Sequence, residues 1–427
     1  LFPYTTLFRS VSAAWRISEE NFWQPLKGWW NDMKIRGSYG SLGNQVMDDL
    51  GNFPYLATYG TNSSYNYLIN GSKPVIVKAP GLVAPDFTWE TVTQMDFGFD
   101  ASFLNNRLTG TFDWYRRNTK DMLVAGATLP ATLGASVPKS NSADMKTIGW
   151  ELSLGWNDRL ENGFSYWVKG VLSDYQATIT KYAGNDAGFY SQSDGDGKYY
   201  VGQKIGEIWG YHSNGLFQSD DEAATIDQSE LYAGKWGAGD VKYEDLDNDG
   251  KITKGEETIY NPGDKSIIGN KTPRYQFGIT VGFDYKNFDF EMFWQGTGKR
   301  DYMLSGAQFW GFTSQWDVPY TPALDYWTET NTDAYFPRPG WQNGGNRVTS
   351  DRYLQSAAYG RLKNLTVGYT IPKNLTTKWG ISRLRLYVTG ENLLTITPLN
   401  DAFDPETLGG MTYPINRKVA IGLNLTL

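Results

Sequence analysis

Apolar and polar residues alternate one by one along much of the chain. The pattern is clearest at the C-terminus, where the apolar positions are Val419, Ile421, Leu423, Leu425 and Leu427. The residues between them are polar, small or charged, and the same period of two recurs within 275–284, 150–157 and 95–103. Successive side chains of a β-strand point to opposite faces, so each segment predicts a strand with one apolar and one polar face.

The connections between the expected strands alternate between short and long. About eleven strands are expected, with short turns near 104–107, 158–163, 284–287 and 372–380, and long links near 43–87, 121–145, 180–272, 302–357 and 394–412. Every second connection of an antiparallel sheet lies at the same end, so the short turns gather at one end and the long loops at the other. This sorting is typical of outer-membrane barrels. We therefore predict an all-β, antiparallel transmembrane β-barrel wall with long extracellular loops; a soluble β-sandwich is the alternative.

Composition supports strands at a membrane. The chain has 17 Trp, 28 Tyr and 21 Phe residues among its 427, together with 47 Gly. No apolar run reaches the roughly 18 residues that a transmembrane helix requires. A transmembrane strand needs only about ten residues of alternating polarity, and its polar face keeps overall hydropathy low. The cell outer membrane is the expected location, with membrane lipid against the apolar face.

Charge and rare residues exclude several functions. The formal net charge is −7, which argues against a nucleic-acid partner. Cysteine is absent and His212 is the single histidine, so thiolate chemistry and most histidine-based catalysis or zinc binding are excluded. No nucleophile elbow, phosphate loop or HExxH motif occurs. We expect no enzymatic activity, and no cofactor for transport.

One acidic segment matches a calcium-loop pattern. Residues 245–256 fit D-x-[DN]-x-[DN]-G-x5-E at each fixed position. Calcium prefers six to eight oxygen ligands, which Asp245, Asp247, Asp249, the Lys251 carbonyl and Glu256 would supply. No helices are expected beside it, so the hypothesis is a single loop stiffened by structural Ca²⁺. The alternative is an acidic, solvated turn.

The first ten residues, LFPYTTLFRS, lack the alternation that begins after them. We interpret residues 1–10 as a non-native leader and exclude them from fold reasoning. Residues 11–427 form the expected barrel segment.

Ordered motifs across 11–427 resemble the C-terminal barrel of SusC/RagA-type TonB-dependent transporters. They include WRISEENFW (15–23), FLNNRLTGTFDWYRRNTKDML (103–123), GDVKYEDLDNDGKI (239–252), RLKNLTVGYTIP (361–372) and LRLYVTGENLLT (384–395). The resemblance implies a barrel of 22 strands, an N-terminal plug, a TonB box and a SusD-like surface lipoprotein over the extracellular mouth. It also implies uptake of glycans or peptides, driven through TonB.

The chain departs from that family pattern. It contains no plug or TonB box, carries about half of the strands, and ends in Leu427 rather than an aromatic residue. We therefore expect an incomplete barrel, an open arc of about eleven C-terminal strands, with TonB contacted through the missing N-terminal region. A half-barrel with open edges in hydrocarbon is not expected to insert or transport by itself.

Other functions remain open from the residues alone. A passive porin is the main alternative, and an outer-membrane enzyme or a soluble glycan-binding β-protein are weaker ones. Four aromatic residues of the expected extracellular loops, Trp209, Tyr211, Trp310 and Trp316, could stack on sugar rings or pack within the loops.

Overall fold

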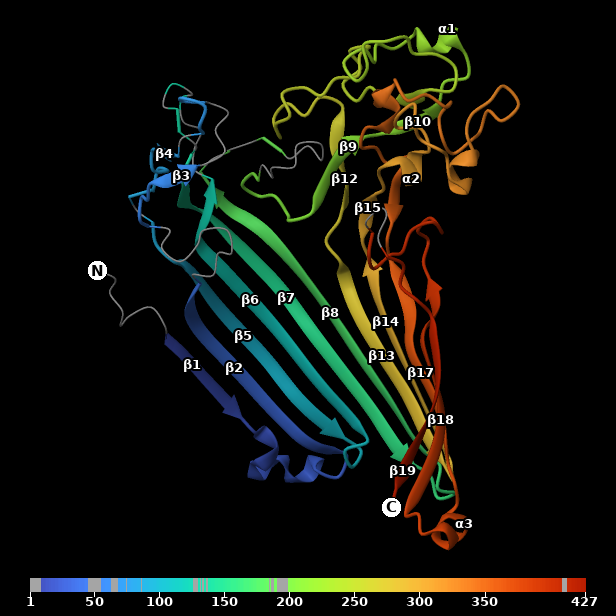
Figure 1. Cartoon of the computed structure of the whole chain (residues 1–427). Coiled ribbons are helices and arrows are strands. Elements are labelled where there is room, and N and C mark those ends of the chain that lie inside the picture. The colour runs from blue at the N-terminus through green and yellow to red at the C-terminus, as the bar shows by residue number, and fades with distance from the viewer. Residues whose placement is uncertain are drawn as a thin grey trace.

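The computed structural model describes residues 9–427 except 45–54, 63–67, 74, 86, 126–129, 131, 133, 136, 184, 186–187, 190–198 and 409–412. Its main element is an eleven-stranded sheet in which each strand pairs antiparallel with its neighbours in chain order (Figure 1). The strands are β1 (Arg9–Trp15), β2 (Trp30–Asn44), β5 (Glu90–Phe103), β6 (Leu108–Ala125), β7 (Lys139–Arg159), β8 (Ser165–Tyr182), β13 (Arg274–Tyr285), β14 (Phe288–Lys299), β17 (Tyr359–Thr370), β18 (Arg383–Ile396) and β19 (Lys418–Thr426). The all-β, antiparallel prediction is confirmed. Within the described residues, the outer edges of β1 and β19 have no strand partner.

Smaller elements lie in the connections. Four short hairpins or strand pairs join β3 (Gly60–Asn62) to β4 (Ile76–Lys78), β9 (Glu207–Tyr211) to β12 (Lys265–Asn270), β10 (Ser213–Leu216) to β11 (Val241–Tyr243), and β15 (Asp301–Met303) to β16 (Leu354–Ser356). The helical turns are η1 (Ile17–Glu19), η2 (Asn21–Leu26), α1 (Asp220–Ala223), α2 (Ala307–Trp310), η4 (Thr321–Leu324), η5 (Gly344–Arg347), α3 (Lys373–Thr376) and η6 (Thr377–Trp379). None of the described helices is long and apolar enough to cross a membrane.

Short and long connections separate to opposite ends of the sheet, as predicted. Figure 1 shows the links after β8, β14 and β18 at the upper end and the turn after β17, with α3, at the lower end. The tight β5–β6 turn uses Asn105 and Asn106 with φ of 59° and 63°. Asparagine tolerates this left-handed backbone better than most residues. The Asn31 side chain closes the turn by accepting hydrogen bonds from both backbone N–H groups, at 2.6 and 3.2 Å.

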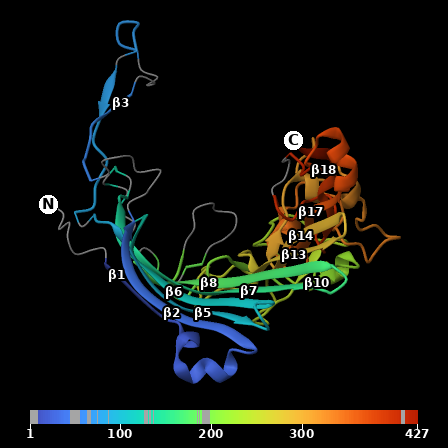
Figure 2. The same cartoon turned by 90° about the horizontal axis from the view of Figure 1, so that it is seen from below.

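One face of the sheet is an exposed apolar band. The register places Leu386 opposite Leu423 and Val388 opposite Ile421, so the aliphatic residues of neighbouring strands share a face. Ile421 is 84% exposed, and Phe97, on the other half of the sheet, is 51% exposed. Figure 2 shows a single curved layer of strands. A sandwich would bury these side chains under a second sheet, so the outward apolar face is confirmed and the soluble sandwich is excluded.

The opposite face is polar and relies on glycine where aromatic rings lie flat against the strands. A Cβ atom on Gly149 would lie 2.5 Å from the Tyr115 ring. A Cβ atom on Gly282 would collide with the indole of Trp167 on the neighbouring strand. Glycine therefore admits a large neighbouring side chain at both positions.

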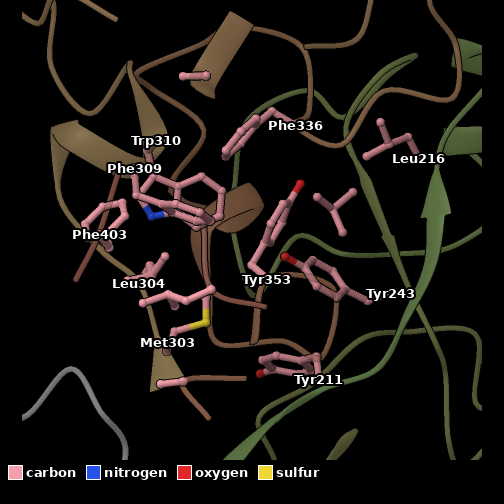
Figure 3. Close-up of a cluster of buried hydrophobic side chains, with 14 of the residues drawn as sticks. Tyr211, Leu216, Tyr243, Met303, Leu304, Phe309, Trp310, Phe336, Tyr353 and Phe403 are labelled. Carbon is pink, nitrogen blue, oxygen red and sulfur yellow. The ribbon is translucent and has the colours of Figure 1, made fainter. Parts of the chain in front are cut away.

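The hydrophobic core of the molecule lies in the long loops and not in the sheet. The described residues of the links 183–273, 300–358 and 397–417 pack together, and we call this unit the loop module. Its core, part of which Figure 3 shows, contains Tyr211, Leu216, Val241, Tyr243, Ile252, Met303, Leu304, Phe309, Trp310, Ala323, Phe336, Tyr353, Ala357, Leu399, Phe403 and Leu408. The core residues come from three links that are far apart in the sequence, so the loops fold together as one unit.

Candidate functional site

Charged side chains on the polar face of the sheet are paired across strands. The Arg36 guanidinium donates to Asp113 at 2.7 Å and to Asp100 at 3.2 Å, joining β2, β5 and β6. The Arg385 guanidinium donates to Asp289 at 2.8 Å, joining β18 to β14. Arg385 and Asp289 compensate each other, and Arg36 with its two aspartates leaves a single negative charge. The face is therefore hydrophilic without a large net charge, which suits the wall of a water-filled lumen.

A buried arginine attaches the β18–β19 link to this polar face. Arg361 on β17 is 2% exposed, and its guanidinium donates to Asp404 at 2.5 Å and to the Thr395 hydroxyl at 2.8 Å. Its Nη1 atom also lies 2.9 Å from a carboxylate oxygen of Glu406, which Lys363 contacts at 3.1 Å. Because the arginine is desolvated and paired with two carboxylates, residues 404–406 are held in a fixed position against the wall.

A second ion pair, in which the carboxylate is buried and the arginine is partly exposed, connects two links of the loop module. Asp240 is fully buried and accepts hydrogen bonds from Arg338 at 2.9 Å and from the Asn346 amide at 2.8 Å. The Tyr243 hydroxyl donates to the Gly345 carbonyl at 2.6 Å in the same region. Burial raises the pKa of Tyr243 well above its ordinary value, so this hydroxyl stays a donor. These bonds fix the link 183–273 against the link 300–358.

The four loop aromatics divide between packing and exposure. Tyr211 and Trp310 are 3% and 8% exposed and belong to the core of the loop module, so they pack rather than offer a stacking surface. Trp209 stacks on Phe189 with centroids 4.1 Å apart and an interplanar angle of 7°. Trp316 is different, since it is 83% exposed.

His212 has a structural position in the loop module. Its Nδ1 atom lies 2.8 Å from a carboxylate oxygen of Asp351, and its Nε2 atom lies 2.7 Å from the Ser266 hydroxyl. The ring therefore bridges two loop segments that are far apart in sequence. Ser266, His212 and Asp351 thus form one hydrogen-bonded chain, which ties these loop segments together.

The acidic segment forms a compact turn in the link between β11 and β12. Within the described residues, Asp245, Asp247 and Asp264 place carboxylate oxygens within 4.8 Å of one another, so the cluster could hold an ion. Desolvation acts to raise the pKa of Asp245, but backbone N–H donors from Gly250, Asn248 and Asp249 hold it below its ordinary value. Desolvation, with the negative charges of neighbouring aspartates, raises the pKa of Asp247. A cation would relieve that repulsion.

The other residues of the calcium-loop pattern, Asp249, Lys251 and Glu256, do not belong to this group of three carboxylates. The Asp249 carboxylate accepts the Lys251 N–H at 2.8 Å, which closes a tight turn. Lys251 also pairs with Asp227 in an isolated β-bridge. The Glu256 N–H donates to the Asn261 carbonyl at 3.0 Å. After Gly250 the loop backbone therefore bonds to other loop residues, and Glu256 is not one of the three clustered carboxylates.

Asp264 is the member that sequence reasoning missed. It is fully buried, and its two oxygens accept the backbone N–H groups of Leu246 and Thr253, each at 2.7 Å. The calcium-loop pattern spans residues 245–256 and does not include this residue. The sequence marks Asp264 only by the Pro-Gly pair before it, and its distance from Asp245 and Asp247 depends on the path of the chain after residue 256.

Comparison with known proteins agrees with this architecture. A model described as the TonB-dependent receptor-like β-barrel matches residues 3–393. The chain belongs to this family.

Several family members resemble the chain over its length. TonB-dependent receptor P3 of Formosa agariphila is 29% identical over 458 residues, which cover 98% of this chain and 41% of that protein. TonB-dependent receptor SusC of Bacteroides thetaiotaomicron is 26% identical over 425 residues, covering 98% and 40%. The solved RagAB peptide transporter shares the fold with a TM-score of 0.75 at 21% identity, covering 98% of this chain and 43% of that one. The chain thus spans about two fifths of the length of these relatives.

The family settles the location and class of the chain. It is an outer-membrane β-barrel sequence of the TonB-dependent receptor family, and it is similar to SusC and to the RagAB transporter. The long-loop end is accordingly the extracellular one, and the polar face lines the lumen. The predicted leader, residues 1–10, stays a prediction: β1 begins at Arg9, and residues 1–8 lie outside the described part.

Proposed function

We propose that this chain forms part of the barrel wall of an active importer that takes up oligosaccharides or peptides. The observation that carries the proposal is the eleven-stranded sheet with an exposed apolar band on one face and paired charges on the other. That division suits a wall between lipid and an aqueous path. The matched relatives include proteins named TonB-dependent receptors and a peptide transporter, which supports active import over passive diffusion.

We place the coupling to TonB outside these 427 residues. The chain matches about 41% of its relative's length, and its described residues form wall and loops. In this arrangement the wall supplies the path and the loop module frames its extracellular mouth. The energy-transducing contact lies in another part of the protein.

The test is uptake by cells that express the natural reading frame containing this chain. Labelled oligosaccharide or peptide mixtures are supplied before and after the proton gradient is dissipated, and in a strain without TonB. Active import predicts that accumulation stops in both cases. Unchanged uptake would instead support a passive porin.

A SusD-like surface lipoprotein is the proposed partner at the extracellular mouth. The loop module carries an exposed apolar segment with Trp316 at 83%, Val318 at 78% and Leu324 at 56% exposure. Exposed apolar segments of this kind mark interaction surfaces. We expect Trp316→Ala combined with Val318→Ala to reduce co-purification of the lipoprotein. Tyr260→Ala is the matched control because Tyr260 is also 83% exposed, in a different part of the loop module.

Structural calcium is proposed for the acidic turn. Asp245, Asp247 and Asp264 would form the centre, with Asp249, the Lys251 carbonyl and Glu256 as the further ligands of the sequence pattern. The ion would stiffen the turn and would take no part in transport.

Calorimetry with CaCl₂ tests this site directly. We expect a saturable binding signal that Asp247→Asn weakens strongly. Asp221→Asn, an exposed carboxylate of α1, is the control and should leave the signal unchanged. Flat titrations of the unmodified protein would leave only an acidic turn.

A further inference from the structure

A hollow of about 480 Å³ lies on the polar face, near the extracellular ends of β8, β13, β14 and β17. Strand register explains its shape. One row across the four strands consists of Ser173, Gln276, Thr297 and Tyr359, each directly opposite the next. The next row contains Gly278, which has no side chain and therefore leaves a recess in the wall.

The floor of this recess is apolar. A Cβ atom on Gly278 would lie 3.0 Å from Val171 and 3.2 Å from the edge of the Phe293 ring. A small residue at this position lets the ring and the valine approach the backbone. The hollow thus combines an aromatic and aliphatic floor with a rim of hydroxyl and amide groups.

The rim amides are available to a ligand. Gln276 and Gln295 are both exposed, and their side-chain amides make no hydrogen bond to any described residue. Backbone groups of the surrounding strands are already used in the sheet ladder. Recognition here must come from side chains, which suits the many hydroxyls of a sugar better than the regularly spaced backbone groups of a peptide.

The hollow also carries one uncompensated positive charge. Glu406, at its edge, is neutralised by Arg361 and Lys363, at 2.9 and 3.1 Å. Arg300 lines the same hollow and donates through Nε to the Lys271 carbonyl at 3.1 Å. This bond orients the guanidinium, and Arg300 forms no ion pair within the described part of the chain. Its terminal nitrogens remain free to bind an anionic group bidentately.

We propose that this hollow is a subsite for an acidic oligosaccharide. Arg300 would receive a sugar carboxylate, Gln276 and Gln295 would hydrogen-bond to ring hydroxyls, and the apolar floor would contact the face of a sugar ring. The assignment rests on the proposed import function and narrows its substrate class.

Binding is measured by calorimetry on the natural protein containing this chain, purified in detergent. The probes are trigalacturonate, the neutral trisaccharide maltotriose, and triglycine, which carries a carboxylate on a peptide. We expect trigalacturonate to bind about tenfold more tightly than the other two, the scale of a charge-assisted hydrogen bond.

Variants locate the site. Arg300→Gln should weaken trigalacturonate binding about tenfold and leave maltotriose within about twofold, because only the acidic probe uses the charge. Gln276→Ala with Gln295→Ala should weaken both saccharides. Arg383→Gln is the matched control: Arg383 belongs to the same polar face at the opposite end of the sheet, and it should change nothing. Unchanged thermal unfolding confirms that each variant is folded.

Four results would overturn the proposal: equal affinity for acidic and neutral saccharides, tighter binding of triglycine, no effect of Arg300→Gln, or no binding of any of the three probes. The readout is separate from transport. Selective binding with uptake that ignores the proton gradient would refute active import alone, whereas energy-dependent uptake without selective binding would refute this subsite alone.

Discussion

Phe309 offers a direct measure of how firmly the loop module is folded. Its ring is fully buried and packs against Trp310, Phe336 and Phe403, with centroids 5.0, 5.2 and 6.2 Å away. Phe403 belongs to the β18–β19 link and the others to the β14–β17 link, so the ring joins two loops. The Phe309→Ala substitution removes this contact and leaves a cavity at the centre of the module.

The expected cost follows from burial. Replacing a fully buried phenylalanine by alanine destabilises a protein by about 3–5 kcal/mol. Each 1.4 kcal/mol corresponds to a tenfold change in population, so the open form of the loop module should rise roughly 100- to 4000-fold. The sheet has its own hydrogen-bonded ladder and should stay intact.

Pulsed trypsin digestion of the natural protein in detergent measures this change. Arg347 donates to the Phe312, Gly340 and Trp341 carbonyls, and Arg352 to Ala334, so cleavage after either arginine requires the module to open. When opening and closing are fast, the cleavage rate follows the open population. We expect a rise of at least about 100-fold in the variant.

Trp316→Ala is the control, because this ring is 83% exposed and its removal leaves no cavity. Its cleavage rate should stay close to that of the unmodified protein. A Phe309→Ala protein cleaved no faster than the Trp316→Ala protein would show that the loops do not share a cooperative core, and the reasoning would be wrong.

Three further outcomes are expected. Val388→Lys, on the apolar band, should destabilise the membrane-embedded protein by about 2–4 kcal/mol in urea unfolding, whereas Thr389→Lys, on the polar face, should cost much less. Arg361→Met leaves Asp404 without its buried partner, so it should cost about 3–5 kcal/mol and accelerate proteolysis of the β18–β19 link. Desolvation and neighbouring carboxylates raise the pKa of Asp247, so this group takes up a proton at a higher pH than an ordinary aspartate. Calcium affinity measured by calorimetry should therefore begin to decline at a correspondingly higher pH as the pH falls. Asp247→Asn should abolish this part of the pH dependence.

The sheet could be predicted from local pattern because each strand depends on a property that sequence displays directly. In β19 the aliphatic residues occupy every second position, and a period of two has one regular interpretation, an extended strand. Asn105 and Asn106 marked a tight turn for an equally local reason, their tolerance of positive φ. Connection lengths then sorted the two ends of the sheet. These features need no knowledge of which distant residues meet.

The sites depended on contacts that no local pattern contains. Asp264 joins Asp245 and Asp247 because the chain turns back after residue 256, and spacing within 245–256 carries no trace of it. The hollow beside Arg300 exists because strand register puts Gln276, Thr297 and Gly278 in adjacent rows. A shift of one residue would turn those side chains to the lipid.

The loop core was also beyond sequence reasoning, for a related reason. Tyr211 and Trp310 are aromatic residues in polar, glycine-rich links, which alone is compatible with either packing or ligand stacking. Burial decided between the two, and burial depends on residues contributed by three separate links. Alternation along the chain thus determined the strands and their two faces, because backbone geometry is local. Tertiary structure decided which loop residues pack, which charges pair and where a ligand can bind, because these depend on long-range contacts whose free energy appears only when the chain is folded.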